Sequence, residues 1–451
     1  DHLQHQLLAQ LCGAQAQLRP REAANVAWAL ARLGAPPGAA EPSRLLQLAW
    51  RLAGGMNAQE VCNTLYATAA LGVQPPAAAA RELLARLHAV AVAGEAEPQG
   101  LANVVWALGR LRVRPHPDTL KALLRASYQH LYTMPPEGLT QLAYGLAGLR
   151  VRMPLAWRDR LLDAAWQRMP SNDLQPQPPL PAATTRQGGH PPGQEISGRQ
   201  ADDVAGGARS SAQAQGALFS ASSLAKLLWA LVRDGRPPPH AWLTACLAEV
   251  EAQAGSLVLP DAANILWALA QMGVQPPLPL LGALMGVVYD HLREAPPPAL
   301  AGIAWSLATL GARPSPQWAE RFLRAAFKSA ERQSVQGVAT ILWALATWGL
   351  RPNAKFVHGM LAGVRPQLAL QGNQEDLTQL CWALPRLQHP LPDWAHTDLR
   401  ALAESQLPHV DSSEAQQAVL EQLQQLGVDT QGLEQLLGAG MEQTGDLSAS
   451  G

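Results

Sequence analysis

Apolar residues recur along this chain at helical spacing, in blocks separated by short turns that contain proline or glycine. The segment LANVVWALGRL, residues 101–111, shows the pattern, because positions three or four apart share one face of a helix and most of them here are apolar. Two adjoining faces are apolar: Leu101, Val104, Val105, Leu108 and Leu111 on one, and Ala102, Trp106 and Gly109 beside it. They leave a narrow strip made of Asn103, Ala107 and Arg110.

The same block recurs along the chain, each time around one aromatic anchor. Successive anchors lie 38 to 40 residues apart, except for one step of 85 residues between Tyr144 and Trp229. A fixed period near 38 residues is typical of an α-solenoid, in which helical hairpins stack side by side. The anchors are Trp28, Tyr66, Trp106, Tyr144, Trp229, Trp267, Trp305, Trp343 and Trp382.

Each repeat is predicted to contain two helices, A and B. Helix A carries the anchor and begins at a proline in its first turn or after a capping residue, and it ends at a glycine. A turn containing proline follows, and helix B then shows charged residues on one side and apolar residues on the other, as a half-exposed helix requires. The boundary residues are Pro20, Pro98 and Pro136, then Asn57, Ser334 and Asn373, and finally Gly34, Gly72 and Gly273.

The predicted fold is all-α: an α-solenoid of about nine 38-residue helix-turn-helix repeats in a right-handed superhelix. The long step equals one period plus 47 residues rich in Pro, Gly, Gln and Ser, a composition typical of flexible segments. This insertion either loops out of a continuous array or separates two blocks of repeats. The predicted segments are a partial repeat helix at 1–18, repeats 1–4 at 19–170, the insertion at 171–217, repeats 5–9 at 218–407, a degenerate capping repeat at 408–437 and a tail at 438–451.

The strip of helix A is predicted to line the concave wall of the solenoid, with the aromatic anchor packed against helix B and the next repeat. The middle position of the strip, that of Ala107, is always Ala, Gly or Ser. The first position, that of Asn103, is a side-chain amide in six of the nine repeats. None of the strip positions is acidic. The candidate binding residues are Asn25, Arg32, Asn63, Asn103, Arg110, Gln141, Lys226, Arg233, Asn264, Gln271, Thr340, Thr347, Gln379 and Arg386.

Amides and guanidinium groups on both sides of a small residue favour single-stranded RNA as the ligand. They hydrogen-bond the edges of unstacked bases, and the small residue leaves room for a ring. An alternative interpretation assigns the small residue to close helix packing and the amide to a bond with a neighbouring turn. A protein-binding scaffold is the alternative of another class, although peptide grooves favour hydrophobic pockets or repeated charges.

The 38-residue period, the helix A consensus L-A-N-x-x-W-A-L-A-x-L-G and the following proline turn resemble the octotricopeptide repeat family of green-algal organelles. The resemblance covers about residues 19–407, with Tyr in place of Trp in two repeats. It implies a nucleus-encoded protein imported into a mitochondrion or chloroplast, the mitochondrion being slightly favoured, that acts on organellar RNA. Members stabilise, process or help translate transcripts, and some belong to ribosomes. By analogy with comparable helical arrays, each repeat would read about one base.

The charge balance bears on whether the protein binds RNA alone or within a larger assembly. The net charge is −1, whereas a free-standing transcript binder is expected to be basic. Near-neutrality suits a protein that is held in a larger assembly whose other proteins supply counter-charge. We therefore expect a protein that stabilises ribosomal RNA within a mitochondrial ribosome, with other proteins of that ribonucleoprotein assembly as partners. A factor for the stability or translation of organellar messenger RNA is the alternative.

No motif for catalysis, metal binding or a cofactor stands out, so we expect a binding protein and not an enzyme. The four cysteines lie far apart, the scattered histidines lack ligand partners, and no phosphate loop or dinucleotide fingerprint occurs. Some members of the family end in a domain suspected of nuclease activity, whereas this chain ends in a degenerate repeat with Glu421 in the aromatic position. No membrane span and no small-molecule substrate are expected, and any targeting peptide is expected to lie outside this sequence.

Overall fold

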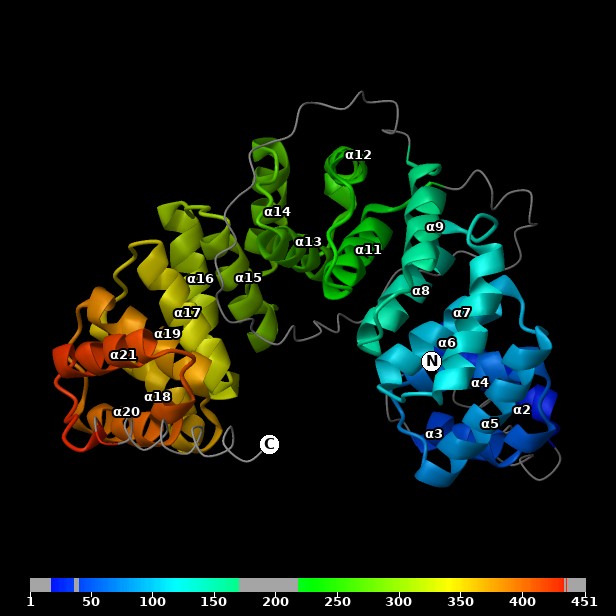
Figure 1. Cartoon of the computed structure of the whole chain (residues 1–451), viewed down its shortest axis with the longest axis horizontal. Helices are drawn as coiled ribbons and strands as arrows, with labels where there is room; N and C mark the ends of the chain where they lie inside the picture. Colours follow the sequence, from blue (N-terminus) through cyan, green and yellow to red (C-terminus); the bar gives the residue numbers. More distant parts are fainter. Residues whose placement is uncertain (1–17, 36–39, 170–217, 434, 436–451) are drawn as a thin grey trace, which may run out of the picture. The chain divides into compact units, whose positions relative to one another are not determined.

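The computed structural model describes residues 18–35, 40–169, 218–433 and 435. Apart from Leu18, the predicted N-terminal helix, insertion and tail lie outside these residues. The described part is helical, without strands, and consists of consecutive helical hairpins (Figure 1). The chain is therefore an α-solenoid of 38-residue helix-turn-helix repeats.

The first helix of each hairpin, helix A, carries the aromatic anchor. The A helices are α2 (Pro20–Arg32), α4 (Ala58–Ala70), α6 (Pro98–Leu111), α8 (Pro136–Gly148), α11 (Ala221–Arg233), α13 (Leu259–Met272), α15 (Pro297–Thr309), α17 (Val335–Thr347) and α19 (Gln374–Leu387). The B helices are α3 (Ala40–Arg51), α5 (Ala77–Ala93), α7 (Pro117–His130), α9 (Leu155–Trp166), α12 (His240–Ala252), α14 (Leu278–His291), α16 (Pro316–Lys328), α18 (Ala354–Gln371) and α20 (Asp393–Gln406). Helix α21 (Ser413–Gln425) follows as the degenerate repeat and packs on α19.

The helix boundaries have the local chemistry that the sequence predicted. Pro98 and Pro136 are in the first turns of α6 and α8, where a missing N–H costs nothing. The Asn57 side chain accepts a hydrogen bond from the backbone N–H of Glu60 at 3.0 Å and so caps α4. Gly72, directly after α4, has a φ of 65°, the left-handed conformation that glycine adopts without strain.

The described residues form two compact units. Unit 1 consists of residues 18–35, 40–169 and 218–256, and unit 2 of residues 257–433 and 435. Within each unit every A helix packs on the A helix of the next repeat, so the A helices form one layer. The unit boundary lies at residues 256 and 257, not at the insertion, because α8 and α11 pack together within unit 1.

Buried polar groups hold repeats 4 and 5 together on the two sides of the insertion. The Asp234 carboxylate accepts a hydrogen bond from the backbone N–H of Met153 at 2.7 Å and lies 3.4 Å from Nε of Arg158. The Arg158 side chain also donates to the backbone carbonyl of Arg236 at 2.8 Å. Trp242 of α12 donates through Nε1 to the carbonyl of Leu162 in α9 at 3.1 Å. The array of repeats is therefore continuous across residues 170–217.

Two A helices of unit 1 approach unusually closely. A Cβ atom added to Gly145 of α8 would lie 2.3 Å from the carbonyl oxygen of Val105 in α6, and one added to Gly109 would lie 2.5 Å from the carbonyl oxygen of Gly145. No side chain fits at such distances, so glycine is required at this contact.

Cysteines and possible metal ligands of the described helices are buried or scattered. Burial raises the pKa of the Cys62 thiol and of the Cys381 thiol to about 12, so both remain protonated at neutral pH. Within the described residues, His, Cys, Asp and Glu side chains form no group suited to a metal ion. Among the same residues, no helix combines the length and the apolar character that crossing a bilayer requires.

Candidate nucleic-acid interface

The side of helix A that remains accessible differs by one position from the predicted strip. In α6 the residues that keep exposed surface along this side are Gln99, Asn103, Trp106 and Arg110, whereas Ala107 is fully buried. The prediction that the small residue forms the middle of the strip was wrong. The anchor contacts the neighbouring repeat, as predicted, but in most repeats it also keeps exposed surface. The exposed strip, as we use the term below, consists of the anchor and the residues seven before, three before and four after it in each helix A.

Close packing between A helices explains this arrangement. Neighbouring helices contact one another through small residues such as Ala107 and Ala268, both with 0% exposure. An indole ring has no room at such a contact, so the anchor turns toward the uncovered side of the layer. The anchor is half-buried in most repeats, and Trp28 of the first repeat is 37% exposed.

The anchors of neighbouring repeats contact one another. The ring centroids are 5.3 Å apart for Tyr66 and Trp106 and 4.8 Å apart for Tyr144 and Trp229. In unit 2, Trp343 and Trp382 lie 6.3 Å apart. These are ordinary distances for tilted aromatic pairs. The rings of the strip keep partly accessible surfaces except that of Trp229, which is only 4% exposed.

Four anchors also carry an arginine over their ring, four residues later in the same helix. The distances from the guanidinium carbon to the ring centroid are 5.7 Å for Arg110 over Trp106 and 4.0 Å for Arg386 over Trp382. In α6, Nε of Arg110 also donates to the carbonyl of Ala69 in α4 at 3.0 Å. Such cation–π contacts hold the planar guanidinium beside the ring. The full set is Trp28–Arg32, Trp106–Arg110, Trp229–Arg233 and Trp382–Arg386.

The polar residues before the anchors are linked from one repeat to the next. Gln99 donates to Asn103 of its own helix at 3.1 Å and to Gln141 of α8 at 3.3 Å. In unit 2, the Thr340 hydroxyl donates to Gln379 at 3.2 Å. These bonds join side chains of A helices, whereas the alternative interpretation had the amides bond to neighbouring turns. Each amide retains further donor or acceptor capacity for a ligand.

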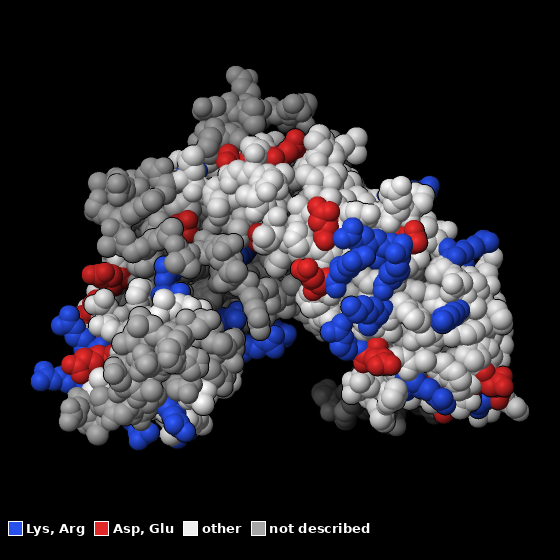
Figure 2. All heavy atoms as spheres, turned by 180° about the vertical axis from the view of Figure 1, so that it is seen from behind, with Lys and Arg blue, Asp and Glu red and all other residues white. Residues whose placement is uncertain are grey.

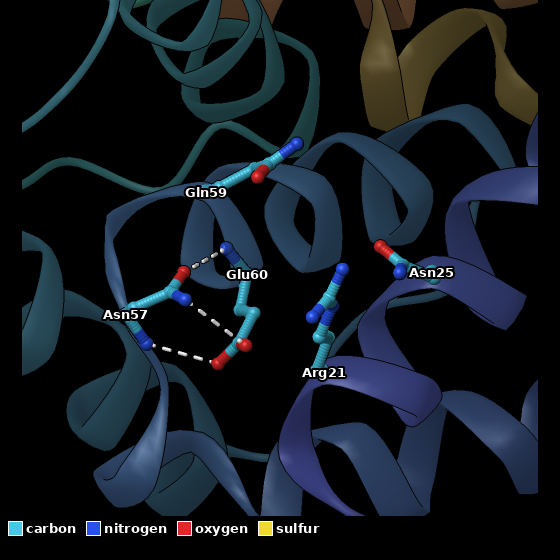
Figure 3. A pocket seen from close by; sticks show the side chains of 5 residues that line it. All are labelled: Arg21, Asn25, Asn57, Gln59 and Glu60. Atoms are coloured by element: carbon cyan, nitrogen blue, oxygen red, sulfur yellow. Dashed lines mark hydrogen bonds between the residues drawn. The ribbon is translucent and has the colours of Figure 1, made fainter.

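A polar recess opens between α2 and α4 at the N-terminal end of the exposed strip (Figure 3). Arg21 and Asn25 line it from α2, and Asn57, Gln59 and Glu60 line it from the start of α4. Asn57 and Glu60 bond to each other as the cap of α4, so the Arg21 and Asn25 side chains are the groups with donors directed into the recess.

The predicted site residues all lie on the A helices, and most of them keep exposed surface. Thr340 is the exception, because only 2% of it is exposed. Asn25, Arg110, Thr347 and Arg386 are exposed. The half-buried residues are Arg32, Asn63, Asn103, Gln141, Lys226, Arg233, Asn264, Gln271 and Gln379.

Several exposed residues of this layer were missed from the sequence. They include the anchors themselves and the polar residues seven before them, such as Arg21, Gln59 and Gln99. A spacing of seven, three and four residues around each anchor follows one side of a helix and would have found them. Also missed were four arginines just after α6 and α8, namely Arg112, Arg114, Arg150 and Arg152.

Basic side chains form local groups and do not cover the protein. On the face shown in Figure 2, Lys and Arg side chains gather in separate patches with Asp and Glu among them. The near-zero net charge therefore coexists with local positive potential, which is what a phosphate-binding surface needs.

Comparisons with known proteins give one family match. Residues 39–176 match the family model of the Tbc2 translation factor, N-terminal domain. This segment runs through α3 to α9 of unit 1 and is less than half of the chain. The octotricopeptide repeat assignment itself stays a prediction. No curated protein sequence matches the chain.

Similar solved structures include large helical proteins. A homology model of the full-length AP-3 complex in an intermediate open conformation is 9% identical, with a TM-score of 0.27, over 96% of this chain and 75% of that chain. A crystal structure of Kap121p bound to Nup53p is 12% identical, also with a TM-score of 0.27, over 97% of this chain and 44% of that chain. Neither similarity is evidence for the function of this protein.

Proposed function

We propose that this protein binds single-stranded RNA along the exposed strip and acts in translation within an organelle. The observation that carries the proposal is the tryptophan–arginine pairs of repeats 1, 3 and 9, whose rings keep exposed surface, because a guanidinium held over an indole offers a plane for a base and donors for a phosphate. The amides beside each pair supply hydrogen bonds to base edges. Such a surface binds and does not catalyse.

Two RNA classes fit this role. Near-neutral charge favours ribosomal RNA inside a mitochondrial ribosome, where other proteins supply counter-charge and contact the exposed sides of the B helices. The match to a translation factor domain favours a factor that acts on an organellar messenger RNA. The organellar location rests on the resemblance to the octotricopeptide repeat family.

A triple substitution tests RNA binding. Arg32→Gln, Arg110→Gln and Arg233→Gln together remove the guanidinium groups over three anchors of unit 1. We expect RNA affinity to fall about a hundredfold at low salt, because each lost contact costs about 1 kcal/mol or more. RNA crosslinking to the native protein and to the variant, followed by sequencing, measures the loss.

The matched control removes the same charge from exposed positions of outer helices, with Arg44→Gln, Arg81→Gln and Arg125→Gln. The control is expected to keep RNA binding and its sequence pattern. Equal crosslinking by the triple variant and the control would reject the strip as the RNA-binding surface. Crosslinked reads that map to ribosomal RNA, with co-sedimentation on ribosomal subunits, support the ribosomal role, and reads concentrated in one messenger support the translation factor.

A further inference from the structure

The same four residues, Leu-Arg-Val-Arg, lie at the point where α6 and α8 end, at 111–114 and 149–152. The arginines of the two segments, Arg112, Arg114, Arg150 and Arg152, are exposed. We call these four residues the arginine edge. They belong to adjacent repeats, and the exposed strip does not contain them.

Two of these arginines occupy a backbone position that six of the other seven repeats fill with glycine and the seventh with Gln388. Arg112 and Arg150 each have a φ of 54°, in the left-handed region. Both sit in the hydrogen-bonded turn that closes helix A, where the N–H of Arg112 donates to the carbonyl of Gly109 at 3.2 Å and that of Arg150 to Ala147 at 3.0 Å. The corresponding residues elsewhere are Gln388 in the last full repeat, with a φ of 59°, and six glycines with positive φ, namely Gly34, Gly72, Gly235, Gly273, Gly311 and Gly349.

An arginine at this position is strained, because its Cβ crowds the backbone in the left-handed conformation. The turn itself needs no side chain, since it closes equally well over glycine in neighbouring repeats. Strain that the fold does not require points to a role for the side chains.

Packing brings the two arginine segments together. A Cβ atom added to Gly148 of α8 would lie 3.1 Å from the carbonyl oxygen of Gly109 and 3.2 Å from its Cα atom, so the two helix ends are in backbone contact. Arg110 of the exposed strip lies one residue beyond Gly109. The two arginine segments therefore follow helix ends that contact each other.

Three of the four arginines of the edge have no acidic partner among the described residues. Asp118, at the start of α7, lies 3.3 Å from Nζ of Lys121 and 3.5 Å from the ring of His116. Arg114, Arg150 and Arg152 form no ion pair with any residue that the structure describes. Clustered like charges repel one another, and a bound polyanion relieves that repulsion.

We propose that the arginine edge binds the phosphodiester backbone of the RNA whose bases lie on the exposed strip. This inference rests on the proposed function and adds the phosphate-binding residues to it. Arg110 joins the two surfaces, because it belongs to the strip and directly precedes the edge. Guanidinium groups bind phosphate oxygens in forked, bidentate pairs, which suits a ligand with one phosphate per nucleotide.

Two double variants of the full chain test the edge. Arg114→Gln with Arg152→Gln removes charge at positions of negative φ, and Arg112→Gly with Arg150→Gly removes charge and restores the usual glycine. The probes are fluorescein-labelled oligouridylate and oligoadenylate of about twelve nucleotides, because the phosphate contribution does not depend on sequence. Anisotropy titrations from about 50 to about 200 mM salt give the affinity and its salt dependence.

Each double variant is expected to bind about tenfold more weakly at the low-salt end, with a salt slope smaller by about 1.4, since each phosphate contact of a single strand contributes about 0.7. The glycine variant is expected to have a Tm no lower than that of the wild type, which separates lost binding from lost folding. The matched control, Arg44→Gln with Arg81→Gln, is expected to keep both affinity and slope.

If both edge variants keep the wild-type affinity and salt slope, the proposal that the arginine edge binds phosphates is overturned, while RNA binding on the strip is unaffected. Failure of the wild-type protein to bind either probe would overturn the proposed function and the edge with it. Equally tight binding of a polyglutamate of matched charge, lost in the same variants, would assign the edge to an acidic protein and overturn the RNA assignment.

Discussion

Unit 1 and unit 2 are built from the same hairpin but differ in the chemistry of their exposed strips. Unit 1 has five basic residues on the strip, whereas Arg386 is the basic residue on the described strip of unit 2. The five in unit 1 are Arg21, Arg32, Arg110, Lys226 and Arg233. The buried positions, by contrast, keep the same small and aliphatic residues in both units. Packing thus constrains the scaffold and leaves the strip free to diverge.

Unit 1 also alternates along its strip. Repeats 1, 3 and 5 pair tryptophan with arginine, and repeats 2 and 4 pair tyrosine with a small residue, Ala70 or Gly148. Every anchor of unit 2 is a tryptophan, and the strip hydroxyl of Thr347 bonds within its own helix, to the carbonyl of Trp343 at 2.9 Å. We therefore expect unit 1 to supply most of the RNA affinity.

The largest expected effect concerns the scaffold of unit 1. Gly145→Ala would place a Cβ atom 2.3 Å from the carbonyl oxygen of Val105, so α6 and α8 must separate. We expect a loss of about 1 to 3 kcal/mol in stability. Gly302→Ala in unit 2 meets no atom within 4 Å and is expected to gain about 0.5 to 1 kcal/mol from higher helix propensity. Thermal unfolding followed by circular dichroism measures both, and shifts of the same sign would contradict the difference in packing.

A smaller effect is expected at the carboxylates that help to cap two of the helices. Asn57 with Glu60 caps α4 in unit 1, and Asn373 with Asp376 caps α19 in unit 2. Burial raises the pKa of Asp376 to about 6, although a hydrogen bond from the backbone N–H of Asn373 opposes the shift. Because the folded-state pKa is above the unfolded one, the contribution of Asp376 to stability is most favourable below about pH 4 and becomes less favourable as the pH rises to about 6.

Asp376→Asn is therefore expected to raise stability by about 1 to 2 kcal/mol at pH 7, since the amide oxygen still accepts the bond from Asn373. The gain is expected to vanish near pH 4, where the aspartate is protonated in both states. Denaturant unfolding at the two pH values measures it. A gain of equal size at both would show that the charge is not its cause.

The repeat and its helix boundaries could be predicted from the sequence because they depend on local chemistry. Pro98 and Asn57 mark helix starts through a missing N–H and a side-chain cap, and these effects act within one turn. The exposed side of helix A could be predicted less accurately than the helix boundaries. Trp106 and Ala107 are adjacent and point about 100° apart, so the rotation of the helix decides which is exposed.

That rotation is set by contacts between repeats that no local pattern contains. Gly109 and Gly145 bring two A helices together because neither has a side chain, and the aromatic anchor is thereby forced outward. The continuity of the array across the insertion depends on a bond between Met153 and Asp234, which are 81 residues apart. The left-handed conformation of Arg112 is likewise not marked in the sequence, because no glycine stands there.

The smallest expected effect concerns the alternation of tryptophan–arginine repeats with tyrosine repeats, which unit 1 has and unit 2 lacks. Ala70→Arg adds a positive charge where Nε of Arg110 already bonds to the carbonyl of Ala69, so the new side chain displaces Arg110 or repels it. We expect RNA affinity to fall about fivefold. Thr309→Arg in unit 2 creates a new tryptophan–arginine pair with Trp305. The neighbouring repeats have Gln271 and Thr347 at this position, so no second arginine competes, and RNA affinity is expected to rise by a similar factor.

Ala85→Arg on the exposed side of α5 is the matched control, and it adds the same charge away from the strip with little expected change in affinity. Anisotropy with labelled oligouridylate measures all three variants at one salt concentration. If charge alone governed binding, Ala70→Arg and Thr309→Arg would both tighten it. Opposite signs would show that the strip depends on where each guanidinium is held over its ring, and that the tyrosine repeats keep a small residue to leave room for the arginine of the next repeat.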